Sequence, residues 1–233
     1  MNNSPSWGAI LVAAGRGTRL GRPKQLLEIA GKPMLAWSLE TFVAMAEIDA
    51  IVVAVEPDIM EATRELAKQI GRGRACEIAV VTGGATRQHS VRSGLDALPG
   101  RCTHVLVHDG ARPNVRAEHV RRGMAVVAPG VGALLATPVV DTVKQLDAAG
   151  KVVRTLDRTW LWTAQTPQFA TVADLRRAHR EAERRELEAT DDATLLERAG
   201  FDVIAVEGDP ENFKVTVASD LRRAEAVLAP ITG

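Results

Sequence analysis

The chain has 233 residues, of which 46% are hydrophobic and 25% charged, and its 29 basic residues are balanced by 29 acidic ones. A chain of this length and composition builds a core of its own, which excludes a disordered tail, a collagen and a membrane bundle. The balanced charge also disfavours a general nucleic-acid binder, because such proteins usually carry a basic excess.

Short apolar runs alternate with helical patterns along the chain. The helical patterns lie at Met34–Ala46, Asp58–Ile70, Thr86–Leu98 and Arg116–Val127, and Thr86 is a candidate N-cap. The runs typical of strands buried on both faces are Ala9–Ala14, Ile51–Val55, Ile78–Val81, His104–Val107 and Ala133–Ala136. This order predicts an α/β fold with a doubly wound, mostly parallel sheet. Because no linker interrupts it, we expect residues 1–233 to form a single domain.

Residues 139–158 depart from this alternation. Two short runs, Thr142–Leu146 and Lys151–Leu156, flank the turn candidate Asp147-Ala148-Ala149-Gly150, which predicts a β-hairpin arm. A lone hairpin is marginally stable, so we expect the arm to pack on a partner subunit. Farther along, Arg176–Glu188 interleaves arginine with glutamate and predicts a solvated helix face.

Signals for export, membrane insertion and metal clusters are weak in the sequence. Residues 1–8 lack the basic and apolar regions of a secretory signal, and the longest apolar run, Val131–Val140, falls short of the ~20 residues of a spanning helix. Cys76 and Cys102 lack metal-ligand spacing, and the five histidines form no zinc motif. We expect free thiols in a reducing cytoplasm, and neither a membrane nor a nucleic acid as partner.

The first strand runs into a loop of glycines and cations, Gly15-Arg16-Gly17-Thr18-Arg19-Leu20-Gly21-Arg22-Pro23-Lys24. Leu20 stands where the dinucleotide fingerprint has its third glycine, and the Gly-Lys-Ser/Thr of a P-loop is missing. Glycine amides can wrap an anion, and the cations Arg16, Arg19, Arg22 and Lys24 neutralise a polyphosphate. Ligands of open α/β sheets bind at the carboxyl ends of strands, so we expect a phosphate site here.

An acid follows the fourth strand, in His108-Asp109-Gly110-Ala111-Arg112-Pro113. Asp109 at this sheet edge suits a magnesium ligand, because magnesium takes one or two carboxylates plus substrate phosphates. A helix cap and a salt bridge with Arg112 stay open as alternatives, and Arg112 is also placed to hold Asp109 in position. His108 is a poor candidate for a general base, because side chains alternate along a strand and it should point away from Asp109.

These two motifs resemble known enzymes. The glycine loop is similar to the Gly-x-Gly-x-Arg…Pro-Lys signature of sugar-nucleotide and related nucleotidyltransferases, and residues 107–113 resemble the cytidylyltransferase family that makes 4-diphosphocytidyl-2-C-methyl-D-erythritol. The resemblance extends from Ala9 to Leu228 through the segments 83–91, 138–144, 157–168, 190–193 and 211–216. It implies a Rossmann-like domain of the nucleotidyltransferase type that dimerises through the arm.

The resemblance also implies an activity and its residues. The activity is magnesium-dependent transfer of a cytidylyl group from CTP to 2-C-methyl-D-erythritol 4-phosphate, releasing pyrophosphate, in non-mevalonate isoprenoid synthesis. The implied catalytic residues are Arg19, Lys24 and Lys214, with Asp109 as the magnesium ligand. The implied nucleotide-binding residues are Ala13, Ala14, Gly15, Gly17, Gly84, Ala85, Ser90 and Asp109. The implied acceptor-binding residues are Asp109, Arg112, Thr142, Arg158, Thr166, Thr190 and Lys214, of which Thr142 and Arg158 come from the neighbouring subunit's arm.

Plainer roles stay open for several of these residues. Lys214 also suits a solvated strand, Ser90 an inner helix face, and Thr166 and Thr190 a turn or a helix cap. Trp160 and Trp162 are more typical of a core or an interface than of base stacking.

Two other functions also stay open. The glycine loop is shorter between Arg19 and Lys24 than in several members and also resembles molybdenum-cofactor nucleotidyltransferases, so ribitol phosphate or molybdopterin is an alternative acceptor. A nucleotide-binding protein without catalysis is disfavoured, because Arg19, Lys24 and Asp109 are all present.

Overall fold

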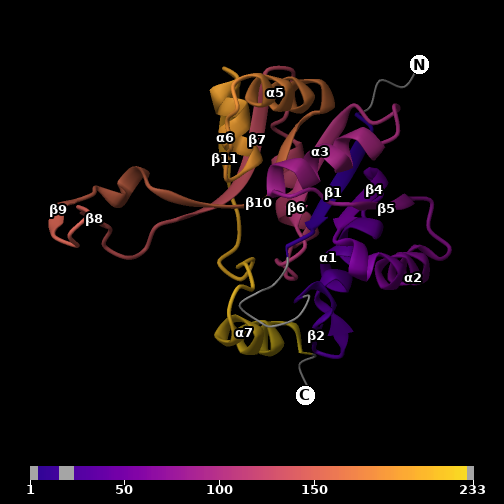
Figure 1. Cartoon of the computed structure of the whole chain (residues 1–233). Helices are drawn as coiled ribbons and strands as arrows, with labels where there is room; N and C mark the ends of the chain where they lie inside the picture. The colour runs from indigo at the N-terminus through magenta and orange to yellow at the C-terminus, as the bar shows by residue number, and fades with distance from the viewer. Residues whose placement is uncertain (1–4, 16–23, 230–233) are drawn as a thin grey trace.

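The computed structural model describes residues 5–15 and 24–229, and its centre is a seven-stranded sheet in the order β11-β7-β10-β6-β1-β4-β5 (Figure 1). Neighbouring strands run parallel except where β10 pairs with β6 and β7. The bounds are β1 Trp7–Ala13, β4 Ile48–Val55, β5 Glu77–Thr82, β6 His104–Asp109, β7 Val131–Pro138, β10 Trp162–Thr171 and β11 Asp202–Glu207. The predicted mostly parallel sheet is confirmed.

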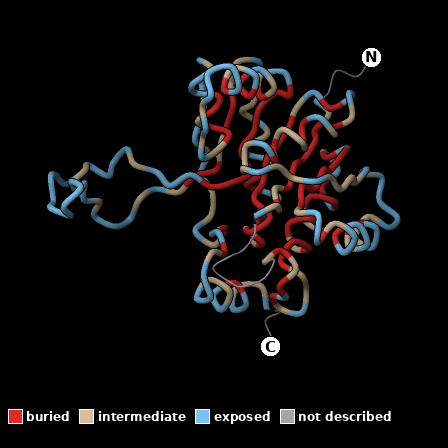
Figure 2. The backbone as a smooth tube through the Cα atoms, in the orientation of Figure 1, coloured by how far each residue is buried: buried red, intermediate tan, exposed pale blue. Residues whose placement is uncertain are grey.

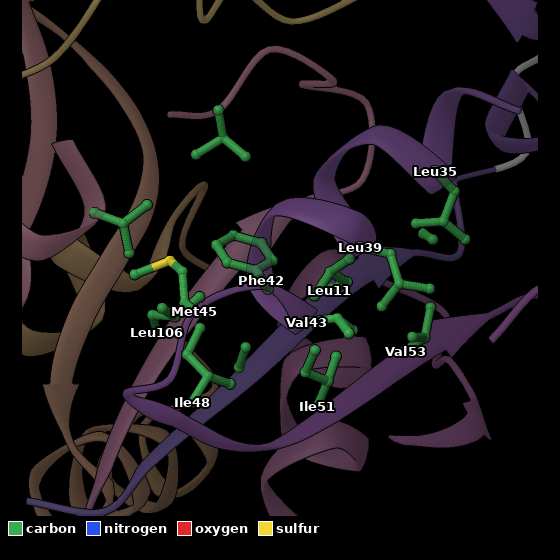
Figure 3. Packing of buried hydrophobic residues seen from close by; sticks show 14 of the residues in the cluster. Leu11, Leu35, Leu39, Phe42, Val43, Met45, Ile48, Ile51, Val53 and Leu106 are labelled. Carbon is green, nitrogen blue, oxygen red and sulfur yellow. The ribbon is translucent and has the colours of Figure 1, made fainter. Parts of the chain in front are cut away.

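Helices cover both faces of the sheet. They are α1 Met34–Val43, α2 Met60–Gly71, α3 Arg87–Ala97, α4 Ala117–Met124, α5 Val172–Arg184, α6 Asp192–Arg198 and α7 Ala218–Leu228. Side chains of α1, α2 and α4 pack in one apolar cluster with Ala9 and Leu11 of β1, whereas α3, α5 and α6 pack with Ile10. Figure 3 shows the first cluster, to which Phe42, Leu39 and Leu106 belong. Alternating side chains of one buried strand therefore serve two cores.

Helix ends follow local capping chemistry. The predicted cap Thr86 is confirmed, because its Oγ1 accepts from the His89 amide at 3.2 Å. The solvated helix expected at 176–188 instead spans Val172–Arg184. Thr171 caps its start, and Glu186 has a positive φ of 52°, which ends the helical path. Its exposed face carries the expected ion pair, Arg177 with Glu181.

The predicted hairpin arm is confirmed and leaves the body between β7 and β10 (Figure 1). Its strands are β8 Lys144–Leu146 and β9 Val152–Thr155, joined by a turn in which Gly150 has a φ of 81°. The 3-10 helix η4 Arg158–Trp160 follows on its return. The arm is almost wholly exposed (Figure 2), and its bare apolar side chains are Val140, Leu146, Val152, Val153 and Trp160. Trp160, 84% exposed, and Trp162, 44% exposed, are not core residues of this chain.

The elements missing from the expected set include two strands of the main sheet, β10 and β11, and two helices, α6 and α7. The chain leaves β7 into the arm and returns beside β7 as β10. Neighbouring strands joined by a hairpin run antiparallel, so β10 is antiparallel to β7. The edge strand β11 follows the 190–193 segment, and the helix α7 follows the 211–216 segment. α7 packs near the small hairpin of β2 Glu28–Ile29 and β3 Lys32–Pro33. Within residues 5–15 and 24–229, no helix is long and apolar enough to cross a membrane.

Candidate active site

A cleft opens where β1, β4, β5 and β6 end, four strands that are neighbours in the sheet. This is the edge at which open α/β sheets bind ligands, and the glycine-loop and strand-end motifs both reach it. The lining residues are Val12, Ala14, Gly15, Lys24, Gln25, Glu56, Gly84, Ala85, Thr86, Arg87, Ser90, Asp109, Ala111 and Lys214.

The wall after β5 is a tight glycine turn. A Cβ on Gly83 would lie 2.3 Å from the Ala14 Cβ, and one on Gly84 would lie 2.3 Å from the His89 Cβ. Ser90 is buried and organises this turn, since its Oγ donates to the Thr86 carbonyl at 3.0 Å and accepts from the Gly84 amide at 3.1 Å. The expected inner-face position of Ser90 is therefore real, and the same side chain also lines the cleft.

The opposite wall begins with the glycine loop. The buried Gln25 donates from Nε2 to the Gly15 carbonyl at 2.8 Å, which ties the loop's start to the 3-10 helix η2 Lys24–Leu26. Lys24 lines the cleft and donates to the Val215 carbonyl at 3.1 Å. The predicted residues Gly17 and Arg19 lie outside the described residues.

A chain of charges crosses the cleft floor. Lys214 Nζ lies 2.7 Å from Asp109 Oδ2, Arg87 Nε lies 3.0 Å from Oδ1, and Arg87 Nη2 lies 2.8 Å from Asp192 Oδ2. Burial alone would raise the pKa of Asp109, but Arg87 and Lys214 outweigh it and hold the pKa well below its usual range. Asp109 is therefore an anion across the physiological range.

Arg112 does not pair with Asp109. Its Nη1 donates to the Asn212 carbonyl at 2.7 Å, and burial lowers the pKa of the guanidinium. The guanidinium that pairs with Asp109 belongs to Arg87, so the alternative of a salt bridge with Arg112 is wrong. The backbone explains this: Arg112 follows a turn closed by its own amide on the Asp109 carbonyl at 2.9 Å, and its side chain extends toward the 211–216 segment instead.

His108 points away from the cleft, as predicted. It is fully buried, packs edge-on against Phe42 with ring centroids 5.3 Å apart, and burial lowers its pKa to about 4. Its Nδ1 lies 3.0 Å from Thr166 Oγ1 and its Nε2 lies 3.0 Å from the Arg112 carbonyl. Thr166 in turn accepts from the Asp109 amide at 3.0 Å. Thr166 is thus placed beneath the cleft floor rather than on it.

Three predicted acceptor residues lie apart from the cleft in this chain. Thr142 and Arg158 are exposed on the arm, where Arg158 Nη1 donates to the Val140 carbonyl. Thr190 is exposed just before α6, and the residue that caps this helix is Asp191, whose side chain accepts from the Thr194 amide. The cap expected at Thr190 is one residue off. Arg112 and Thr166 do not line the cleft either. Of the remaining described candidates, Ala13 is buried in β1, and the rest line one cleft: Ala14, Gly15, Lys24, Gly84, Ala85, Ser90, Asp109 and Lys214.

Sequence reasoning missed Arg87, Asp192 and Gln25. Arg87 stands in the 83–91 motif and Asp192 in the 190–193 motif, so both were visible as motif positions. Their partnership was not, because 105 residues separate them and only the packing of α5 against both α3 and α6 brings them together. Within the described residues, no three His, Cys, Asp or Glu side chains gather as a metal cluster.

Comparisons with known proteins agree with this geometry. The family model described as 2-C-methyl-D-erythritol 4-phosphate cytidylyltransferase matches residues 8–230. A protein of that name from Prochlorococcus marinus is 42% identical over 226 residues, covering 94% of this chain and 97% of its own, and one from Synechococcus is 44% identical over 222 residues, covering 94% and 98%. The crystal structure of a 4-diphosphocytidyl-2C-methyl-D-erythritol synthase from Anaerococcus prevotii superposes with a TM-score of 0.83 at 29% identity, covering 96% of this chain and 98% of its own.

The family model covers nearly the whole chain, both relatives exceed 40% identity over almost their full length, and the fold is shared end to end. The predicted family and enzyme class are confirmed. The chain belongs to the 2-C-methyl-D-erythritol 4-phosphate cytidylyltransferases, a family of nucleotidyltransferase enzymes.

Proposed function

We infer that the protein transfers the cytidylyl group of CTP to 2-C-methyl-D-erythritol 4-phosphate and releases pyrophosphate, as the names of its relatives state for them. The observation that carries this is the cleft floor, where Lys214 and Arg87 pair with Asp109 in a cleft that Lys24 also lines. Cations around one strand-end acid suit a reaction between two phosphate groups, in which anionic repulsion is the main obstacle.

The chemistry follows from the charges. A phosphate monoester has its second pKa near ~6, so the acceptor oxygen is already an anion at pH 7 and needs no general base. That oxygen forms a bond to the α-phosphorus of CTP as the bond to pyrophosphate breaks. Arg19, Lys24 and Lys214 are the proposed donors to the phosphates and to the charge that builds up in the transition state. The glycine turn with Gly84, Ala85 and Ser90 is the proposed seat of the base.

Nucleotidyl transfer is assisted by a divalent cation, and we propose magnesium held by Asp109. The residue fits this role, because its carboxylate lines the cleft and stays ionised, and magnesium needs only one or two protein carboxylates beside substrate phosphates. When bound, the ion neutralises phosphate charge. The ion pairs with Arg87 and Lys214 then orient the carboxylate toward the cleft.

The proposed acceptor site combines two chains. Asp109, Arg112, Thr166, Thr190 and Lys214 come from one body, and Thr142 and Arg158 come from the arm of a second subunit. Support for a homodimer lies in the apolar side chains that the arm exposes, among them Trp160 at 84%. We also propose a single domain over residues 1–233 and a cytoplasmic location, with which the two free cysteines agree.

The test is pyrophosphate release with magnesium, CTP and 2-C-methyl-D-erythritol 4-phosphate, for the wild type and for Lys24→Ala. Removing one donor to the transition state lowers kcat by about 10²–10³-fold. Lys68→Ala, which removes an exposed lysine of α2, serves as the matched control and keeps the wild-type rate. Turnover with ribitol phosphate or molybdopterin in place of this acceptor contradicts the proposed substrate. An unchanged rate in Lys24→Ala contradicts the proposed role of the loop.

A further inference from the structure

His108 is not among the proposed substrate residues, but it is buried against Thr166, which is one of them, and the pair touches Asp109 and Arg112. The ring of His108 is 0% exposed and Thr166 is 4% exposed, so no solvent competes for their hydrogen bonds. Three contacts of 3.0 Å join the Asp109 amide, the Thr166 hydroxyl, the His108 ring and the Arg112 carbonyl in one line. Buried polar groups in such a line must each be satisfied.

The direction of every hydrogen bond in this line follows from its two ends. The Arg112 carbonyl can only accept, so the proton of the imidazole sits on Nε2. Nδ1 of a neutral ring then accepts, and among the residues that the structure describes its partner is the Thr166 hydroxyl, which donates the proton. The Thr166 oxygen, having donated its proton, accepts from the Asp109 amide. One arrangement of protons satisfies all four groups.

We propose that His108, as the neutral Nε2–H tautomer, is a positioning residue that fixes Asp109 through Thr166 and fixes the Asp109–Arg112 turn through the Arg112 carbonyl. The inference rests on the proposed function, because it concerns the same cleft floor. The inference also adds to the proposed function, because Thr166 donates its hydroxyl proton to His108. Thr166 therefore serves the acceptor substrate by holding Asp109 in place and not by donating to it.

The turn between Asp109 and Arg112 is held from both sides. Above, the Gly110 amide donates to the Val12 carbonyl at 2.9 Å, and the Val215 amide donates to the Ala111 carbonyl at 2.8 Å. Below, the His108 ring is the side chain that reaches the Arg112 carbonyl. The glycine turn with Gly84 and Ser90 comes from another segment, and its printed hydrogen bonds stay within that segment. The two regions meet at Asp109, which Arg87 of α3 also contacts. Loss of the line should therefore lower kcat/KM for the acceptor, and any effect on CTP should come through Asp109.

The first test reads the protons directly, on the wild-type protein without substrate. Nitrogen-15 NMR of the imidazoles, with His108 identified by its absence in His108→Gln, is expected to show a protonated Nε2 and a bare Nδ1 at pH 7. A protonated Nδ1, or averaging between the two tautomers, overturns the proposal. This readout does not depend on turnover. A wild type that fails to use the acceptor therefore contradicts the proposed function and leaves the inference about His108 unaffected.

The second test is a double-mutant cycle on kcat/KM for the acceptor. Thr166→Val and His108→Gln each break the line at the same bond, and each is expected to lower kcat/KM by about tenfold or more. The double variant is expected to be no worse than the poorer single one, because both act through one contact. Thr166→Ser keeps the hydroxyl and is expected to restore the rate.

Two outcomes of the cycle overturn the proposal. They are additive losses and a Thr166→Val variant as active as the wild type. His104→Gln is the matched control, because His104 lies on the same strand at the end away from the cleft. Thermal unfolding of each variant separates misfolding from mispositioning, and the NMR test stands even where a variant fails to fold.

Discussion

The cleft and the arm both carry proposed substrate residues, but the fold holds them in opposite ways. At the cleft, Asp109 is 7% exposed and is gripped by two cations and a buried hydroxyl from three other segments. On the arm, Arg158 is exposed, and its hydrogen bond goes back to the arm's own Val140. One chain thus completes the cleft floor by itself. The arm presents apolar and charged side chains that become useful only against another surface.

The largest expected effect is at the cleft. Asp109→Asn keeps the shape of the side chain but removes the charge that Arg87 and Lys214 share, and kcat for pyrophosphate release is expected to fall by about 10²–10³-fold. Asp58→Asn, an exposed acid before α2, is the control and leaves kcat unchanged. A variant within about threefold of the wild-type kcat would place the catalytic charge elsewhere and weaken the contrast with the arm.

A second comparison sets two leucines against each other. Leu106 of β6 is 0% exposed and Leu146 of β8 is 53% exposed. Leu106→Ala is expected to lower the free energy of unfolding by about 2–5 kcal/mol, because it leaves a cavity in the core shown in Figure 3. Leu146→Ala is expected to change it by less than about 0.5 kcal/mol in dilute protein. Urea unfolding measures both, and similar losses in the two variants would mean that the arm packs on the body of its own chain.

A third prediction concerns the partner that the arm is proposed to meet. If Trp160 is an anchor between subunits, Trp160→Ala weakens the dimer by about 2 kcal/mol, which raises the dissociation constant about 30-fold. Sedimentation at a series of concentrations measures this. Val217→Ala, which trims an apolar side chain 41% exposed outside the arm, is the control. An unchanged dissociation constant in the tryptophan variant would move the interface away from the arm.

The smallest effect is a pH dependence confined to the body. Burial is the main reason that the pKa of His179 lies below its ordinary value, although Asp192 partly opposes the shift. The unfolded chain therefore binds a proton more readily than the folded one, so stability is complete above the unfolded pKa of about 6.5 and falls as the pH drops below it. The urea midpoint is expected to decrease from pH 7 to pH 5.5, and His179→Gln should decrease less. An equal decrease in both proteins would assign the effect to other groups.

Much of the fold and of the site was predictable from local sequence. Short apolar runs such as Ile51–Val55, alternating with helical patterns, are typical of strands covered on both faces, and they predicted the parallel core. The turn residues Asp147 and Gly150 predicted the hairpin of the arm. The glycines near Ala14 and the acid after β6 sit at strand ends, and parallel strands bring their ends to one edge. The cleft residues Lys24, Gly84, Ser90, Asp109 and Lys214 were named on that basis together with the family motifs.

Only the tertiary structure determined which side chains pair with one another. Local sequence offers Arg112 to Asp109, three residues away, yet the ion pair is made by Arg87 from α3, because the turn aims Arg112 at Asn212. It also decided that Asp192 closes this network and that Thr166 lies beneath the floor against His108. The periodicity of a strand or a helix depends on neighbouring residues, so the sequence alone determined these elements and the edge of the sheet at which the site lies. Side-chain partners depend on distances between segments that lie 22 to 105 residues apart in the chain, which only the packed core sets.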